Sequence, residues 1–332
     1  MGGRRGELHK YAARQHASIC LPMARAKTGG LNGFSAIFVL WAALGIACAQ
    51  DLVPRAYLVT PVGANAITLS SSFFDGSIST DPTVPITDSK GRFNLAIFSY
   101  SRSLALFGRS ANVVGSVPYA VGTFSGVVAG NAKSVYRSGL TDARIRFAMN
   151  LRGGPAMDTQ DFVKWRETFV LGASLTVIAP IGQYDPAKAV NPGLNRWAFK
   201  PEVGMAKRWG RWALDLYGGV WFYTANPAYF PGSSTRAQRP VGAMETHLNY
   251  AFRPRLWVSL DGNFWTGGQS TINGSPKPDA QRNSRAGVTV AVPLNRRQSL
   301  KFSYNSGAYV AIGGDYKNIS AAWQYSWLSG AK

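Results

Sequence analysis

Residues 140–152 alternate between apolar and polar side chains more regularly than the rest of the chain. The odd positions from 145 to 151 are all apolar, whereas Arg144, Arg146 and Asn150 occupy even positions. Because successive side chains of a β-strand point to opposite faces, this period of two predicts a strand with one apolar and one polar face. Similar alternation predicts about twelve strands along the chain. They cover residues 66–74, 93–101, 111–120, 140–152, 167–179, 197–207, 212–223, 244–250, 256–265, 285–292, 299–305 and 316–327.

The connections between these strands alternate between long and short. The long ones cover residues 77–92, 121–139, 180–197, 225–240 and 267–282, and most of the others are tight turns. This asymmetry is typical of an up-and-down barrel in an outer membrane, with short periplasmic turns and long extracellular loops. Lipid offers no hydrogen-bonding partner, so only a closed sheet is stable there. We therefore predict an all-β fold, an antiparallel transmembrane β-barrel.

Two segments outside the strands have features of their own. Residues 51–65 contain Pro54 and Pro61 and are expected to form an extended lead-in to the first strand. Residues 153–166 make a connection long enough to hold a short helix.

Tryptophans gather near the ends of the predicted strands. They are Trp197, Trp209, Trp212, Trp221, Trp257, Trp265, Trp323 and Trp327. In outer-membrane barrels such residues form girdles at the two membrane interfaces. The alternative is a soluble β-sandwich whose aromatic side chains fill a core. One broad apolar face opposite a polar face, repeated from strand to strand, favours the barrel.

An apolar stretch at residues 33–49 ends in Ala47-Cys48-Ala49, a small-x-small cleavage signal. The stretch is too short and wrongly flanked for a transmembrane helix, so we expect a secretory signal peptide within residues 1–49. Met23 precedes two basic residues and then the apolar stretch, and a start there would give a signal peptide of ordinary length. Residues 50–332 would then form a single barrel domain, exported to the outer membrane of a Gram-negative cell.

Cysteine and histidine usage leaves few routes to a metal site. Both cysteines, Cys20 and Cys48, lie in the predicted signal peptide region, and His247 is the one histidine beyond it. The sequence contains no phosphate loop, nucleophile elbow, CxxC or HExxH motif. Glu245 and Asn249 share a strand face with His247, but neighbours two residues apart on a strand are too distant for a reliable hydrogen bond. We expect no enzymatic activity, no cofactor and no metal.

The formal net charge is +20 at pH 7, and many basic residues occupy predicted turns. These are Arg208, Arg211, Arg253, Arg255, Arg296 and Arg297. Two roles fit them, either as solvated turn residues or as contacts with anionic lipid head groups. No run of Lys and Arg is dense enough to predict a nucleic-acid partner.

The polar faces of the predicted strands would point into the barrel. The pore-lining candidates are Arg144, Arg146, Lys200, Glu202, Asp215, Tyr217, Tyr223, Glu245, His247, Asn249, Asp261, Asn263 and Lys301. Two roles are compatible here. Opposite charges on neighbouring strands would cross-link the wall. The aromatic side chains would line a narrow path and stack on a planar solute.

The loop at residues 180–197 has the most motif-like sequence of the long connections. Its mouth candidates are Gln183, Tyr184, Asp185, Asn195, Arg196 and Trp197. We expect the last three to anchor the loop at the barrel mouth, with Trp197 at the membrane interface. Arg196 or Lys200 would pair with an acidic neighbour such as Asp185 or Glu202. The sequence leaves open whether this loop is a gate or a structural lid.

Several stretches resemble one family of outer-membrane proteins. They are Pro54-Arg55-Ala56-Tyr57 with Pro61-Val62-Gly63, residues 106–111, 117–120, 180–185 and 195–202, and Trp323-Gln324-Tyr325-Ser326-Trp327. In these stretches, spread over nearly the whole chain after the signal peptide, the sequence is similar to the transporter family named for the meta-pathway of phenol degradation. The resemblance implies an exported barrel, often associated with the degradation of aromatic compounds. It carries over no catalytic residues.

These features together predict an outer-membrane channel for small hydrophobic or aromatic compounds, linked by the resemblance to phenol-type degradation. The alternative is a closed structural or loop-binding barrel without transport activity. The expected partners are outer-membrane lipid, the solute, and the barrel-assembly machinery during biogenesis.

Overall fold

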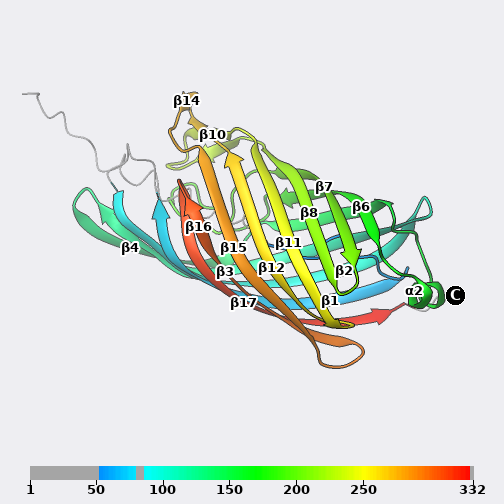
Figure 1. The fold of residues 1–332 in the computed structure, drawn as a ribbon. Helices are drawn as coiled ribbons and strands as arrows, with labels where there is room; N and C mark the ends of the chain where they lie inside the picture. Colours follow the sequence, from blue (N-terminus) through cyan, green and yellow to red (C-terminus); the bar gives the residue numbers. More distant parts are fainter. Residues whose placement is uncertain (1–51, 80–85, 330–332) are drawn as a thin grey trace, which may run out of the picture. The chain divides into compact units, whose positions relative to one another are not determined.

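Twelve antiparallel strands close into a barrel in the computed structural model, which describes residues 52–79 and 86–329 (Figure 1). The main sheet contains thirteen strand segments. Two of them, β4 (Asn131–Leu140) and β5 (Ala143–Arg152), follow one another along the same neighbour, β3 (Arg109–Val128), and act as one long strand. The ring closes because β2 (Ile86–Leu106) pairs with both β1 (Ala64–Ser79) and β3. The prediction of an all-β transmembrane barrel is confirmed.

Each predicted strand coincides with an observed one. The other barrel strands are β6 (Phe169–Ala179), β7 (Ala198–Trp209), β8 (Trp212–Tyr223), β11 (Val241–Arg253), β12 (Leu256–Gly267), β15 (Gln281–Pro293), β16 (Gln298–Val310) and β17 (Gly313–Leu328). The predicted signal peptide, residues 1–49, lies outside the described residues. All of the described residues belong to one compact unit, Gly33–Lys332.

The two ends of the barrel differ in their connections (Figure 1). One end, here called the short-turn end, carries tight turns such as Phe107-Gly108, where both residues have positive φ angles of 50° and 71°. This left-handed backbone suits the twist of a two-residue hairpin. The connection after β5 holds the predicted short helix, α2 (Thr159–Lys164), which is N-capped by the Asp158 carboxylate. The other end, called the long-loop end, carries the extended connections.

Two predicted loops are largely strand, which corrects the boundaries expected from the sequence. Strand β2 begins at Ile86, and residues 121–139 form a hairpin of β3 and β4 around a turn at Ala129-Gly130. Side chains here are mostly half-buried or exposed on both faces. Because neither face of this hairpin is apolar, its period of two leaves no hydrophobic signal in the sequence.

A separate four-stranded sheet forms from two of the long loops at the long-loop end (Figure 1). Its strands are β9 (Asn226–Tyr229), β10 (Ser234–Gln238), β13 (Ser270–Ile272) and β14 (Ser275–Pro276). Tyr229 and Phe230 are buried beneath it and pack against Tyr184 of the loop at 180–197. Burial raises the pKa of Tyr229 to about 12.

Apolar side chains cover the outer face of the barrel, and charged side chains are buried inside it. Leu69, Leu260 and Ile319 are 51–62% exposed, as expected for a lipid-facing surface. Trp197 and Trp209 are also exposed near strand ends. No helix among the described residues is long and apolar enough to cross a membrane.

The predicted aromatic girdle is wrong for three of its members. Trp257 faces the interior of the barrel, where the Arg55 guanidinium lies over its ring at 5.4 Å. Trp221 is 2% exposed and Trp265 is 0% exposed, and both pack inside the barrel against Ile178 and Val241. Their place at a strand end suggested the interface. Their odd positions, however, put them on the same face as the buried acids of β8 and β12, and this alternation decides which way they point.

Candidate functional site

A cavity of about 2470 Å³ occupies the interior of the barrel. Its lining includes Leu194 and Trp221 from the long-loop end and Arg255 and Arg297 from the short-turn end. Among the described residues the cavity therefore reaches from one end of the barrel toward the other.

One wall of this cavity is built from small hydroxyl side chains on β1, β2, β3, β16 and β17. They are Ser70, Ser72, Ser99, Ser101, Ser116, Ser303 and Ser320. Ser99 and Ser116 are hydrogen-bonded across neighbouring strands, with their oxygens 2.9 Å apart. Small polar side chains leave the cavity wide on this side and offer hydrogen bonds to whatever fills it.

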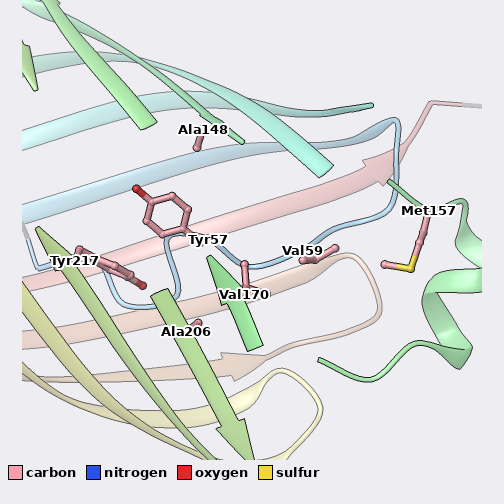
Figure 2. Packing of buried hydrophobic residues seen from close by; sticks show 7 residues of the cluster. All are labelled: Tyr57, Val59, Ala148, Met157, Val170, Ala206 and Tyr217. Atoms are coloured by element: carbon pink, nitrogen blue, oxygen red, sulfur yellow. The ribbon is translucent and has the colours of Figure 1, made fainter. Parts of the chain in front are cut away.

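The segment at residues 52–63 runs inside the barrel, against the opposite wall (Figure 2). Tyr57 is 2% exposed and Val59 is 0% exposed. The Tyr57 hydroxyl donates to Glu202 Oε1 of β7 over 3.0 Å and lies 3.1 Å from Ser174 Oγ of β6. The segment expected to be a lead-in thus narrows the lumen before the chain enters β1.

Two glycines make room for the Tyr57 ring. Gly172 of β6 and Gly204 of β7 are paired across the strands. A Cβ atom built on Gly172 would lie 2.3 Å from Tyr57 Cδ1, and one on Gly204 would lie 2.1 Å from Tyr57 Cε2. Glycine inside a strand often marks such a close approach, and here it creates the niche for an aromatic ring.

Wall residues also bind the backbone of this segment. The Arg55 amide donates to Asp215 Oδ2 over 2.9 Å, and the Ala56 amide donates to the Tyr217 hydroxyl over 3.0 Å. Arg146 donates to the Ala56 carbonyl over 3.3 Å, and its guanidinium stacks on the Tyr57 ring at 4.9 Å. These contacts satisfy backbone groups that would otherwise be buried without partners.

A network of opposite charges cross-links the same wall. Lys200 Nζ lies 2.6 Å from Glu202 Oε2 and 3.1 Å from Glu245 Oε1. The guanidinium of Arg146 lies 3.5 Å from Glu202 Oε1. All four side chains are less than 20% exposed. Buried charges require such pairing, because desolvation of an isolated one is costly.

His247 extends this network to the next strand pair. Its Nδ1 lies 2.7 Å from Asp261 Oδ1, and its Nε2 lies 3.6 Å from Glu245 Oε2. Asp261 also accepts hydrogen bonds from Ser259 and Thr289. Because His247 is 0% exposed and the Ser259 hydroxyl points to a carboxylate, this group holds the wall together and presents no nucleophile to the cavity.

The structure divides the predicted pore-lining residues into two groups. Those that border the cavity are Arg144, Arg146, Lys200, Glu202, Tyr217, Glu245 and Lys301. Asp215, His247, Asn249, Asp261 and Asn263 are at most 5% exposed and lie within the wall, not on the cavity surface. Part of the reason is the segment at 52–63, which covers Asp215. Tyr223 is half-buried beside Trp221, with the Arg196 guanidinium over its ring at 4.4 Å.

One carboxylate fastens both ends of the loop at 180–197. Asp142, at the break between β4 and β5, accepts from the Gly182 amide over 3.0 Å and from the Leu194 amide over 2.8 Å. Leu194 and Pro192 border the cavity. The loop therefore forms part of the lumen wall at the long-loop end.

The six mouth candidates all take part in holding this loop or its neighbours. The backbone amides of Gln183 and Trp197 donate to Leu140 O and to Thr224 Oγ1. The Tyr184 hydroxyl donates to Ala228 O, and the Asn195 side chain donates to Asn226 Oδ1. The Arg196 guanidinium donates to Gln238 Oε1. Asp185 pairs with Lys188 at 2.9 Å, and this ammonium lowers the pKa of the Asp185 carboxyl. Of the ion pairs predicted between Arg196 or Lys200 and an acidic neighbour, the structure shows the pair of Lys200 with Glu202. Arg196 donates instead to an amide oxygen.

In the described part of the chain, no group of three or more His, Cys, Asp and Glu side chains is placed to hold a metal ion.

The sequence did not predict the role of residues 52–63, here called the inserted segment, or the niche that holds Tyr57. The one visible signal was the pair of inward-facing glycines, Gly172 and Gly204, in otherwise regular strands.

Comparison with known proteins decides the family. A model of the family described as "Putative MetA-pathway of phenol degradation" matches residues 75–311. The chain belongs to this family. No curated protein matches the sequence.

One solved structure shows the same architecture. The barrel is similar to the crystal structure of the COG4313 outer membrane channel from Pseudomonas putida F1, with a TM-score of 0.70 and 20% identity over 83% of this chain and 100% of the other. It also matches the β domain of the Bordetella autotransporter BrkA, with a TM-score of 0.48 and 13% identity over 80% and 100%. The KdgM porin in complex with disordered oligogalacturonate gives a TM-score of 0.42 and 7% identity over 79% and 99%. The first of these shows that the family member described here has the fold of an outer-membrane channel.

Proposed function

We propose that this protein is an outer-membrane channel for small hydrophobic or aromatic molecules. The observation that carries the proposal is the cavity of about 2470 Å³, whose lining residues come from both ends of the barrel. The family description, which names phenol degradation, supports aromatic compounds as the solute class. A barrel whose interior was filled by its own side chains would offer no such path.

The cavity is suited to a planar solute. Trp257 is half-buried and offers part of an apolar ring face beside polar groups, while Tyr217 and Trp221 border the cavity with only 3% and 2% of their surface exposed. The inserted segment narrows the space without filling it. A solute would pass between this segment and the serine-lined wall.

The proposal includes a location and a direction. An apolar outer face and closed sheet fit an outer membrane, with the short-turn end in the periplasm and the long loops outside. A signal peptide within residues 1–49 would direct export, and the barrel-assembly machinery would insert the chain. The outer face would contact membrane lipid, and no nucleic acid is expected as a partner.

Solute entry into liposomes tests this function. Purified protein would be reconstituted and the entry of phenol-sized aromatic solutes compared with that into empty liposomes. Faster entry with the protein is expected. Entry no faster than in empty liposomes, together with no ionic conductance, would contradict a channel.

A closed barrel whose long loops bind a partner is the second candidate. The observation in its favour is the depth at which Tyr57 and its segment occupy the lumen. Replacing residues 267–282 by a short turn separates the two functions. Loss of binding at the cell surface with unchanged solute entry would favour the second candidate, and the reverse would favour the channel.

A further inference from the structure

Basic side chains greatly outnumber acidic ones on the cavity surface. Among the described residues that line it, thirteen are Lys or Arg and four are Asp or Glu. Six of the thirteen are exposed at the turns and connections of the short-turn end, and the other seven border the cavity from the strands and from the segment at 52–63. Clefts with low-dielectric walls concentrate the field of such charges and enrich ions of the opposite sign.

The four acidic residues offset only part of this excess, and each of them is held by donors of the protein. Asp142 accepts two backbone amides of the loop at 180–197. Glu167 lies 3.5 Å from Arg208. Glu202 and Glu245 share Lys200, at 2.6 and 3.1 Å. Four carboxylates leave a formal excess of nine positive charges among the described residues that line the cavity.

The basic side chains are distributed along the path. Arg166, Arg211, Arg253 and Arg296 border the cavity from the turns and connections of the short-turn end. Further in, Arg102 and Lys301 border it from β2 and β16, and Arg144 and Arg146 border it from β5. An anion could thus pass from one basic group to the next, with serine hydroxyls as donors on the other side.

Two of the guanidinium groups are held beside aromatic rings. Arg146 stacks on Tyr57 at 4.9 Å, and Arg55 stacks on Trp257 at 5.4 Å. Stacking fixes the plane of a guanidinium, whose fork geometry matches a carboxylate. Tyr57 is 2% exposed, so its ring is closed to a solute, whereas Trp257 is half-buried and leaves part of its ring face to the cavity. Arg55 and Trp257 together therefore offer both halves of a molecule that joins a carboxylate to an aromatic ring.

We infer that the channel selects anions and that its solute class is small aromatic carboxylates. This inference rests on the proposed function and narrows it. For a neutral aromatic solute, only the rings would stabilise its binding in the lumen. For an aromatic carboxylate, both the rings and the positive potential of the lumen would stabilise it.

Ion selectivity tests the electrostatic half of the inference. Purified protein in a planar bilayer under a potassium chloride gradient should prefer chloride over potassium by about ten-fold. Replacing Arg144 and Lys301 together by Gln should lower that preference, and the Arg144→Lys, Lys301→Arg pair should keep it. Lys133→Gln, an exposed position on β4 away from the cavity, should leave it unchanged. A wild-type channel without anion preference would overturn the inference.

Entry of matched solutes into liposomes tests the carboxylate half. Benzoate, benzyl alcohol and benzylammonium share a ring and differ in charge. Because neutral benzyl alcohol crosses lipid unaided, the rate compared is the entry above that into empty liposomes. By this measure benzoate should enter fastest, and the double Gln variant should lose that advantage while still admitting benzyl alcohol. Equal entry of all three, or faster entry of benzylammonium, would overturn the assignment. Only the absence of both conductance and solute entry would count against the channel itself. Variants would first be checked for a folded barrel by resistance to unfolding in detergent.

Discussion

Tyr57, on the segment before the first strand, donates its phenolic hydrogen to the Glu202 carboxylate on β7 over 3.0 Å. The same carboxylate pairs with Lys200 at 2.6 Å and with Arg146 at 3.5 Å. Glu202 therefore joins the inserted segment to the charge network of the wall. Substitutions of Tyr57 or Glu202 should alter both the stability of the barrel and the width of its lumen.

Gly204→Ala should displace the Tyr57 ring. Its Cβ would lie 2.1 Å from Tyr57 Cε2 and 2.7 Å from Tyr217 Cδ1, so a rigid aromatic group must shift. We expect a loss of about 1–3 kcal/mol in the free energy of unfolding, as for other overpacked sites. With the segment displaced, single-channel conductance should rise, and the segment should become accessible to protease.

Gly218→Ala is the matched control, because a Cβ atom on that glycine of β8 would meet nothing within 4 Å. It should leave conductance at the wild-type value. Unchanged conductance in Gly204→Ala as well would mean that the inserted segment does not narrow the path.

Lys200→Met should destabilise the barrel strongly. It leaves Glu202 and Glu245, both less than 10% exposed, without their shared cation. Removing one partner of a buried charge pair costs about 3–5 kcal/mol. Denaturant unfolding of the refolded barrel in lipid vesicles measures this cost.

The control is Arg92→Met, which breaks a pair with Asp75 whose side chains are 69% and 46% exposed. It should cost no more than about 1 kcal/mol. Adding Glu245→Gln to Lys200→Met should restore part of the lost stability. Similar losses in the free energy of unfolding for Lys200→Met and Arg92→Met would show that the charges around Lys200 are not shielded from water as described.

Leu69 and Ser70 are adjacent on β1 and test the assignment of the two faces. Leu69 is 51% exposed on the outer face, and Ser70 borders the cavity. Leu69→Arg should cost about 2–4 kcal/mol near the middle of the membrane. Ser70→Arg should cost less and should reduce conductance by occupying the lumen. Equal losses in the free energy of unfolding of the two variants, measured in lipid vesicles, would mean that the inner and outer faces of β1 are assigned wrongly.

Asp142→Asn should loosen the loop at 180–197. An amide offers one acceptor oxygen where the carboxylate serves two amides, so either Gly182 or Leu194 loses its partner. A loss of about 1–3 kcal/mol of local stability is expected for the amide left unsatisfied. Hydrogen exchange of the loop amides should accelerate, while that of β15 and β16 should not. Unchanged exchange would show that other contacts hold the loop.

Strand positions and facing could be predicted because a lipid-facing barrel imposes a period of two on every strand. The alternation at residues 145–151 shows this, since Ile145 is exposed to the outside and Ala148 is buried inside. Where that constraint ends, prediction weakened. The hairpin at 121–139 has mixed burial on both faces. A place at a strand end predicts the membrane interface for Trp221, Trp257 and Trp265, whereas all three face the interior.

The inserted segment could not be predicted from local pattern. Tyr57 meets Glu202 from 145 residues away in sequence, and Arg55 meets Asp215 from 160 residues away. No period or motif announces such pairings. Only tertiary structure shows which of the candidate acids and bases border the cavity and which the segment covers.

Single-channel current through the purified wild-type protein in a planar bilayer tests the central claim most directly. A continuous lumen narrowed by the Tyr57 segment predicts small, discrete current steps, with larger steps for Gly204→Ala. A folded barrel that passes no current in either form would contradict the claim that this lumen is a path across the membrane.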